Sequence, residues 1–408
     1  MDTGHRSSLR SRCARAVRAH APALVGLSHS IHAEPELAFA EHESVRKITT
    51  VLADEGFEVR GPVAGLDTAF TASFGHGDLV VGLCAEYDAL PEVGHACGHN
   101  VIAAAAVGAA LGLRDVADEL GITVLVIGTP AEEVGGGKVL MLERGVFDPV
   151  ALALMVHPGP EETVTRPSRA IADLEVRYTG RESHASSAPE RGINAADALT
   201  VAQVAIGLAR QHLEPGQQVH GIVTHGGAAP NIVPARTSAV FNLRAPEVES
   251  LARLSGRIED CLRAGAVATG AGYETSEISP VYAELRPDDW LAEAYREAVV
   301  DLGRAPLSPA EERSRVSGST DMGNVTHVVP GIHPTLALDC GDAVNHQPEF
   351  AAACVSPSAD QAVLDGAVAM AWTAVAAATD SEQRTRLLAD VAGRAAASRK
   401  VAATGGAA

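Results

Sequence analysis

Several short segments of the sequence carry side chains that could bind metal ions or transfer protons. The richest is residues 86–100, in which Cys97 and His99 are two residues apart. Thiolate and imidazole are the favoured ligands of zinc-like ions. A Cys-x-His pair is also typical of a turn with a buried thiol, so this segment alone leaves both interpretations open.

Two adjacent carboxylates, Glu132 and Glu133, form a second candidate. Adjacent carboxylates that face a pocket repel each other unless cations neutralise them. We therefore expect one to bind a metal and the other to act as a general base. The alternative is a solvated helix N-terminus, where acidic side chains are favoured. Glycines beside Lys138 also suggest a phosphate loop, but the Gly-x-x-x-x-Gly-Lys-Ser/Thr pattern is absent.

Two histidines, His157 and His346, add further ligand types. A single histidine is more often structural than functional, and the recurrence of ligand types along the chain is what favours a metal site. Two metal ions can clamp a bridging water and polarise a carbonyl group. The residues that could hold two such ions are Cys97, His99, Glu133, His157 and His346, which leaves Glu132 as a base.

These side chains are positioned by alternating strands and helices. Three of the segments, those that contain Cys97, Glu132 and His157, each follow an apolar, strand-like run. Ligands of open α/β sheets bind outside the carboxyl ends of the strands. Strands alternating with helices predict an α/β fold with a largely parallel sheet. The predicted strands are residues 69–74, 79–84, 122–127 and 151–156, and the predicted helices are residues 10–29, 41–55, 100–113 and 137–144.

The pattern changes in residues 167–280, which we predict to be an inserted domain. Residues 172–178 alternate between apolar and polar side chains, as in a half-buried strand. The predicted order β-α-β-β-α-β is the ferredoxin-like pattern. The first domain then comprises residues 1–166 and 281–408, of which residues 385–408 are expected to form a frayed tail.

Composition excludes some classes of function. The formal net charge is −19, from 32 Lys and Arg against 51 Asp and Glu, which argues against broad nucleic-acid binding. Six scattered cysteines favour a reducing cytoplasm over a disulfide framework. Apolar runs such as residues 101–113 are shorter than the ~20 residues of a membrane span. The Arg-rich first 22 residues superficially resemble a transit peptide, and the favoured alternative is the exposed face of a helix.

Together the motifs resemble the M20 peptidases, the co-catalytic metallopeptidases that include aminoacylases and glutamate carboxypeptidases. Cys97 is typical of the amidohydrolase branch, which bridges its metals with Cys and not Asp. Residues 86–100, 128–138 and 318–325 look most like the subgroup around p-aminobenzoyl-glutamate hydrolase and β-alanyl-lysine-type dipeptidases. The motifs are spread over nearly the whole chain.

The resemblance implies a zinc-peptidase-like α/β catalytic domain with an inserted ferredoxin-like lid that dimerises. It implies metal-dependent cleavage of the amide bond of an N-acyl amino acid or dipeptide, with Glu132 as general base on a metal-bridging water. Asp88 matches an acidic residue that orients a metal ligand. Two divalent ions are expected per subunit, with zinc favoured and manganese, cobalt or nickel as alternatives. Cys97 would bridge the ions, Glu133 and His346 would complete one site, and His99 and His157 the other.

In the lid, the resemblance gives roles to three further residues. His184 matches the histidine that reaches the partner subunit's active site and stabilises the oxyanion. Asn231 and Arg244 match positions that hold the substrate carboxylate, whose geometry suits an Arg fork. Without the resemblance, His184 would be interpreted as a polar loop residue and Arg244 as a surface charge. The expected assembly is a cytoplasmic homodimer that acts on a small molecule, without nucleic-acid or membrane partners.

The sequence departs from the family pattern at two positions, and three functions other than a general amidohydrolase or dipeptidase are also considered. Glu86 stands where many relatives have Asp, and Asn100 where many have Asp, but neither change removes a ligand. A metal-free Cys97 nucleophile with His99 as base would leave the other ligand types unexplained. A non-catalytic, ligand-binding dimer would have no need of Glu132. A specialised biosynthetic or catabolic deacylase would share every catalytic residue.

Overall fold

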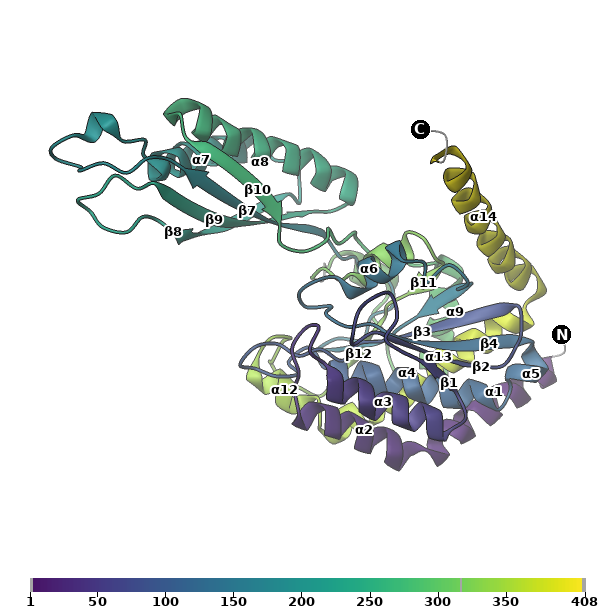
Figure 1. The fold of residues 1–408 in the computed structure, drawn as a ribbon. Coiled ribbons are helices and arrows are strands. Elements are labelled where there is room, and N and C mark those ends of the chain that lie inside the picture. Colours follow the sequence, from purple (N-terminus) through teal and green to yellow (C-terminus); the bar gives the residue numbers. More distant parts are fainter. Residues whose placement is uncertain (1–2, 316–317, 406–408) are drawn as a thin grey trace. The chain divides into compact units, whose positions relative to one another are not determined.

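The computed structural model describes residues 3–315 and 318–405. The chain forms two compact units (Figure 1). Unit 1 consists of Met1–Pro167 and Leu285–Ala408, and unit 2 of Ser168–Glu284. Unit 2 therefore interrupts unit 1 in the sequence.

The core of unit 1 is a mixed, mostly parallel sheet, which confirms the predicted fold class. Its strand order is β1-β2-β4-β3-β5-β11, and the pairs from β4 to β11 are parallel. Only β2 breaks the pattern within this sheet, since it runs antiparallel to both β1 and β4. The strands are β1 (Glu58–Arg60), β2 (Phe70–Phe74), β3 (Leu79–Ala85), β4 (Ile122–Gly128), β5 (Leu152–Leu154) and β11 (Gly331–Ile332).

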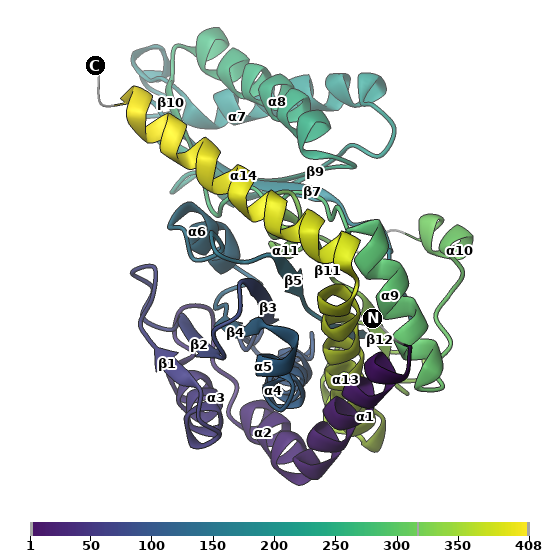
Figure 2. The same ribbon diagram turned by 90° about the vertical axis from the view of Figure 1, so that its right-hand side faces the viewer.

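Two long, small-residue helices, α4 (His99–Arg114) and α13 (Pro357–Thr379), pack against each other beside this sheet (Figures 1 and 2). Their backbones approach closely, because a Cβ added at Gly108 would lie 2.7 Å from the Cβ of Ala367. Helix α13 is long and apolar enough to cross a membrane, but 83% of its most apolar window is buried inside the fold. Its hydropathy is therefore explained by its place in the core.

The other helices and short strands of unit 1 complete this layer and its loops. The helices are α1 (Thr3–Ala19), α2 (Ala21–Ala33), α3 (His42–Asp54), α5 (Ala117–Leu120), α6 (Gly137–Glu143), α9 (Asp289–Asp301), α10 (Pro309–Arg313), α11 (Met322–Thr326), α12 (Pro348–Ala353) and α14 (Ser381–Gly405). A two-stranded parallel ribbon is formed by β6 (His157–Gly159) and β12 (Thr335–Ala337).

Two local expectations differ from the structure. The single helix predicted over residues 10–29 is divided into α1 and α2, because Pro22 starts a new helix in its first turn and cannot continue the old one. Of residues 385–408, expected as a frayed tail, residues 385–405 belong to α14, and residues 406–408 lie outside the described part of the chain. Leu387 is fully buried, and Leu388 and Val391 pack against the core, so this helix is anchored through its first half.

Unit 2 has the predicted β-α-β-β-α-β order. Its four strands form an antiparallel sheet in the order β10-β7-β9-β8, which makes β8 and β10 the edges. Its two long helices supply a separate apolar core with one face of that sheet. The elements are β7 (Ala170–Thr179), η1 (Pro189–Arg191), α7 (Ala195–Ala209), η2 (Arg210–His212), β8 (Gln218–His225), β9 (Arg236–Ala245), α8 (Val248–Thr269) and β10 (Gly272–Glu277).

Candidate active site

The site lies in unit 1, where the loops that follow β3, β4 and β5 meet. His99 is the first residue of α4, and Gly98 before it has a left-handed φ of 75°. A Cβ at Gly98 would lie 2.4 Å from Cγ of Pro158 and 2.9 Å from Sγ of Cys354. Only glycine fits both this conformation and this space, and its presence sets the direction in which α4 begins.

Asp88 connects two of the expected metal ligands. Its Oδ1 lies 2.9 Å from Nδ1 of His99, and its Oδ2 accepts a hydrogen bond of 3.0 Å from the backbone N–H of Glu133. The side chains of Asp88 and His99 are buried. One carboxylate thus fixes the orientation of His99 and the position of Glu133.

The five expected ligands fall into two groups. Donor atoms of Cys97, His99 and His157 lie within 4.8 Å of one another. Donor atoms of Cys97, Glu133 and His346 meet the same limit. Cys97 belongs to both groups, so a single thiolate could contact two ions.

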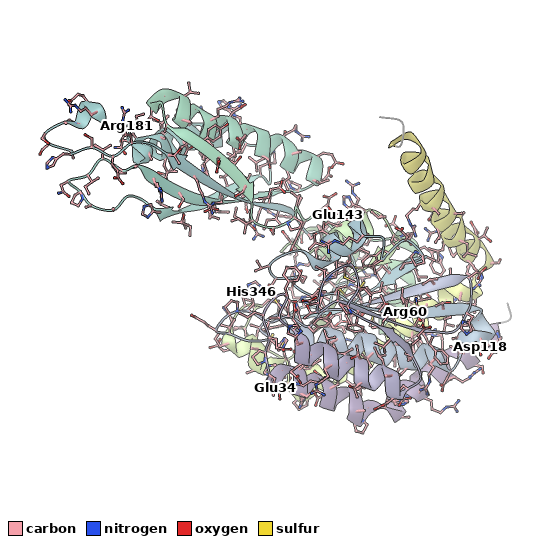
Figure 3. All side chains as sticks on the ribbon, viewed as in Figure 1. Glu34, Arg60, Asp118, Glu143, Arg181 and His346 are labelled. Atoms are coloured by element: carbon pink, nitrogen blue, oxygen red, sulfur yellow. The ribbon has the colours of Figure 1, made fainter. Side chains whose placement is uncertain are left out.

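His346 comes to this site from far along the chain. Its backbone N–H donates to the carbonyl of Ala96, next to Cys97, at 2.9 Å. Its Nε2 lies 3.7 Å from Oε2 of Glu133. The side chain, labelled in Figure 3, is 60% exposed, so this half of the site opens to solvent.

The backbone is strained at two points beside these ligands. Ala131, just before Glu132, has a φ of 59°, and His346 has a φ of 72°. Left-handed conformations of residues other than glycine are uncommon and cluster at functional sites. At Ala131 the backbone N–H is held by Oε1 of the buried Glu41, at 2.9 Å. Glu41 therefore secures the turn that presents Glu132 and Glu133.

A third group of donors surrounds His99. Atoms of Glu86, His99 and Glu132 lie within 4.8 Å of one another. Nε2 of His99 is 3.4 Å from Oε2 of Glu86, 3.9 Å from Oε2 of Glu132 and 3.8 Å from Oε1 of Glu133. His99 is thus surrounded by carboxylate oxygens on the side away from Asp88.

Burial and mutual repulsion perturb the ionisation of these groups. Burial, reinforced by Glu86 and Glu133, raises the pKa of Glu132 well above its usual range. Burial alone would lower the pKa of His99, but Asp88 and Glu86 outweigh it and raise that pKa well above its usual value. Such shifts are typical of functional sites.

The two remaining buried ligands are shifted mainly by desolvation. Burial, with the nearby Glu133 carboxylate, raises the pKa of the Cys97 thiol well above its usual value. Burial, with His333 nearby, lowers the pKa of His157 to about 3. His157 is therefore a neutral imidazole, ready to bind a cation, and Cys97 needs a cation beside it to become a thiolate.

The charges and unpaired atoms of the cluster fit a cationic ligand. Within residues 3–315 and 318–405, the buried atoms Oε2 of Glu86, Nε2 of His99 and Oε1 of Glu133 have no hydrogen-bond partner. Buried polar atoms without partners are rare and need a cause. Five carboxylates meet here with one lysine, so the cluster has an excess of acidic groups that suits cationic ligands. The carboxylates are those of Glu86, Asp88, Glu132, Glu133 and Asp321, and the lysine is Lys138.

The three lid residues lie in unit 2, at two ends of its sheet. His184 forms an isolated bridge with Ile232, and the N–H of Ala185 donates to the carbonyl of Asn231, so His184 and Asn231 lie together. Arg244 is at the far end of β9, where it pairs with Ile171 of β7. Arg244 lies eight positions after Arg236 along β9, a span of roughly 26 Å. Unit 2 alone does not bring all three residues together.

Sequence reasoning gave three residues of this neighbourhood no role in the site. Lys138 and Asp321 form buried ion pairs, and their separation of 183 residues gives no local signal. The ring of His333 lies 5.4 Å from that of His157, centroid to centroid. One signal could have found it, because His333 precedes a proline just after a strand, as His157 does.

Comparison with known proteins places the chain in a family. Residues 168–269, nearly the whole of unit 2, match the peptidase dimerisation domain of the M20 peptidases. The chain is 39% identical over 386 residues to the Xaa-Arg dipeptidase of Mus musculus, an alignment that covers 90% of this chain and 88% of the relative. The chain belongs to the M20 peptidase family. It is therefore a metal-dependent hydrolase of amide bonds.

Two further comparisons agree with this assignment. One of the two polypeptides of the p-aminobenzoyl-glutamate hydrolase of Escherichia coli K12 is 32% identical over 281 residues, covering 64% of this M20 peptidase and 58% of the relative. A Bacillus subtilis structure described as a dinuclear metal binding peptidase from the M20 family aligns with a TM-score of 0.67 at 23% identity. That alignment covers 88% of this chain and 98% of the other, and it shows the same fold.

Proposed function

We propose that this M20 peptidase cleaves the amide bond of a dipeptide or N-acyl amino acid, with two divalent metal ions bound in unit 1. The observation that carries the proposal is that the donors form two groups that share Cys97. Cys97 would bridge the ions, Glu133 and His346 would complete one site, and His99 and His157 would complete the other. Cys and His ligands favour zinc, and manganese, cobalt and nickel are the alternatives to test.

Glu132 is the proposed general base. When bound, the ions would supply a Lewis acid that polarises the amide carbonyl and acidifies water. Glu132 would take a proton from the attacking water and return it to the nitrogen of the leaving amine. Its carboxylate lies beside His99 but belongs to neither of the groups that share Cys97, which supports a role in proton transfer.

His184 is the proposed hydrogen-bond donor to the oxyanion. The backbone N–H of Ser186 donates to Nδ1 of His184 at 3.3 Å, so in the neutral ring the proton is on Nε2. That side chain is exposed and can donate outward. Asn231 beside it, and Arg244 at the other end of β9, are the proposed ligands of the substrate carboxylate. Their separation within one unit 2 supports contributions from two subunits to each active site.

Unit 2 carries a surface that suits a homodimer. Strand β8 is an edge of the unit 2 sheet (Figure 1). Its side chains Ile222 and Val223 are 68% and 47% accessible. Helix α7 exposes Val204 and Leu208, at 58% and 65%. An edge strand with apolar side chains is a template for pairing with a second chain. We propose that two copies of unit 2 associate through β8 and α7.

The substrates to test first follow from the relatives. The mouse relative is named for dipeptides ending in arginine and the E. coli relative for p-aminobenzoyl-glutamate, so both classes belong in the panel. All six cysteines are free, which supports a reducing cytoplasm as the place of action.

The experiment is to purify the full chain, count metal ions per chain, and assay amide cleavage with and without added zinc, manganese or cobalt. The panel contains Xaa-Arg and Xaa-Lys dipeptides, N-acyl amino acids and p-aminobenzoyl-glutamate. We expect about two ions per chain and metal-dependent release of the free amino acid. Bound metal without turnover of any compound would point to one specialised substrate. A protein that binds no metal under any condition would refute the proposal.

A further inference from the structure

A buried ion-pair cluster adjoins the metal ligands and has no role in the mechanism above. Nζ of Lys138 lies 2.5 Å from Oε1 of Glu86 and 2.7 Å from Oδ1 of Asp321. The backbone N–H of Lys138 also donates to Oδ2 of Asp321, at 2.9 Å. All three side chains have no solvent exposure or almost none. Burying these charges is costly, so the cluster is expected to serve a purpose beyond stability.

The cluster fixes one oxygen of Glu86 and leaves the other unpaired. Oε1 faces the ammonium group of Lys138, whereas Oε2 is buried and has no hydrogen-bond partner in the part of the chain that the structure describes. Nε2 of His99 lies 3.4 Å from Oε2 and likewise has no partner there. Lys138 thus holds Glu86 so that its free oxygen points toward His99.

The contacts of His99 determine which of its ring nitrogens faces Glu86. Its Nδ1 faces a carboxylate oxygen of Asp88 at 2.9 Å, and a carboxylate only accepts, so Nδ1 carries a proton. Nε2 is then the ring atom open to a metal ion, and Oε2 of Glu86 faces it at 3.4 Å without a hydrogen-bond partner. A divalent cation held by Nε2 would also be within reach of that oxygen. Two donors each about 2.1 Å from one tetrahedral ion are separated by roughly 3.4 Å.

We infer that Glu86 is a further metal-contacting residue, which binds through Oε2 the same ion as Nε2 of His99 and is held in place by its ion pair with Lys138. The inference rests on the metal site proposed above and adds a carboxylate to its His99 half. The group of Glu86, His99 and Glu132 shares His99 with the group of Cys97, His99 and His157, so the Glu86 carboxylate lies beside the ligands proposed for that ion. A carboxylate at this position would also make the site more acceptable to manganese.

The test compares Glu86→Gln with wild type in the full-length protein loaded with cobalt. Glutamine keeps the shape of the side chain and an oxygen for Lys138, but it removes the charge. We expect one of the two ions to bind about 10- to 100-fold more weakly and the visible d–d bands of cobalt to change. The near-ultraviolet band from thiolate to cobalt should persist, because Cys97 is unchanged. Circular dichroism and thermal melting establish that the variant is folded.

Glu312→Gln is the matched control. Glu312 is also a fully buried carboxylate paired with a cation, Arg296, at 2.8 Å, and it is not a member of the three donor groups. This control should bind cobalt as the wild type does, with the same spectrum. A Glu86→Gln variant that binds both ions with wild-type affinity and spectrum would overturn the inference and leave the proposed function standing. A wild-type protein without metal binding would overturn both.

A second measurement covers the case in which Glu86→Gln does not fold. Wild-type crystals soaked in manganese would show the ions directly by anomalous scattering. The inference requires an ion within about 2.0–2.5 Å of Oε2 of Glu86. If each ion lies more than about 3 Å from that oxygen, Glu86 is no ligand and the inference is wrong.

Discussion

Glu132 and Glu133 are neighbours in the sequence, but their surroundings differ at the scale of single atoms. The backbone of Glu133 is tied to Asp88, and its carboxylate groups with Cys97 and His346. The carboxylate of Glu132 groups with Glu86 and His99 instead. One position therefore suits a metal ligand and the other a proton carrier.

Glu132→Gln should lower kcat by about 10²- to 10⁴-fold, because the amide cannot take up the proton of the attacking water. Metal content should stay at the wild-type value, since Glu133 and not Glu132 is the proposed ligand. Steady-state kinetics and elemental analysis of the same preparation measure both quantities. Glu133→Gln is the matched control and should lose metal. Loss of metal from Glu132→Gln would show that the two roles are reversed.

Asp88→Asn should weaken metal binding by about 10- to 100-fold, because the residue orients one ligand and positions another. An amide can still accept a hydrogen bond, but it no longer stabilises the polarised ring of His99. Competition with a chromophoric chelator measures the dissociation constants. An unchanged affinity for both ions would mean that Asp88 serves only the backbone of Glu133.

The sequence pointed to the candidate ligands, which the structure brings together, but not to the residues that support them. Cys97, His99 and Glu133 each follow an apolar strand, so strand order alone gathers them at one edge of the sheet. Lys138 lies in the first turn of α6 and Asp321 directly precedes α11, 183 residues apart, and no periodicity connects them. Their pairing depends on tertiary packing, which local patterns do not encode.

At the scale of elements, strongly patterned segments were predicted well and their junctions were not. The strands predicted over residues 79–84 and 122–127 correspond to β3 and β4 within one residue at each end. The break between α1 and α2 depends on Pro22, a single residue inside an otherwise helical pattern. Apolar periodicity shows which face of a helix or strand is buried. The point at which a helix breaks can depend on the backbone of a single residue, here Pro22.

The junction at which the chain leaves unit 1 allows a test of how the free energy of unfolding depends on pH. Glu312 accepts hydrogen bonds from the backbone N–H groups of Val164 and Thr165 and from Arg296, at 2.8–2.9 Å. These bonds fix the segment that leads out of unit 1 at Pro167. Burial alone would raise the pKa of Glu312, but the hydrogen bonds from Thr165, Arg296 and the backbone outweigh it and lower that pKa.

Glu312→Gln should lower the free energy of unfolding by about 1–3 kcal/mol at pH 7. A carboxyl group with a depressed pKa stabilises the fold above its unfolded pKa, and that contribution is lost as the pH falls through the folded pKa. The difference between wild type and variant should therefore shrink below about pH 4.5. Urea denaturation at pH 7 and pH 4 measures it. Glu293→Gln, on the exposed face of α9, is the control. A difference that does not depend on pH would contradict this account.

At the scale of the molecule, the proposed dimer links the lid to catalysis. The double variant Leu208→Glu and Ile222→Lys places charges on both apolar parts of the proposed interface. We expect it to be monomeric by analytical ultracentrifugation, with full metal content and turnover reduced about 10²- to 10³-fold through loss of the partner's donor. An active monomer would show that the lid acts within its own chain.

Mixing of variant chains tests the same idea without disturbing the interface. His184→Ala and Glu132→Gln should each be nearly inactive alone. After dissociation and reassociation, mixed dimers contain one active site with both groups intact, so turnover should recover to about a quarter of wild type. No recovery, with mixed dimers demonstrably formed, would place His184 and Glu132 of the same chain in one site.

Because unit 2 interrupts unit 1 in the sequence, the two segments of unit 1 are synthesised at different times, before and after unit 2. Cys97, His99 and Glu133 emerge first, the self-contained Ser168–Glu284 unit follows, and His346 and α13 come last. Helix α4, which starts at His99, packs against α13 and so waits for that last segment to cover it. A chain truncated after unit 2 would therefore carry a folded lid on a catalytic half that cannot close its core. Premature termination anywhere before α13 should therefore abolish the enzyme outright.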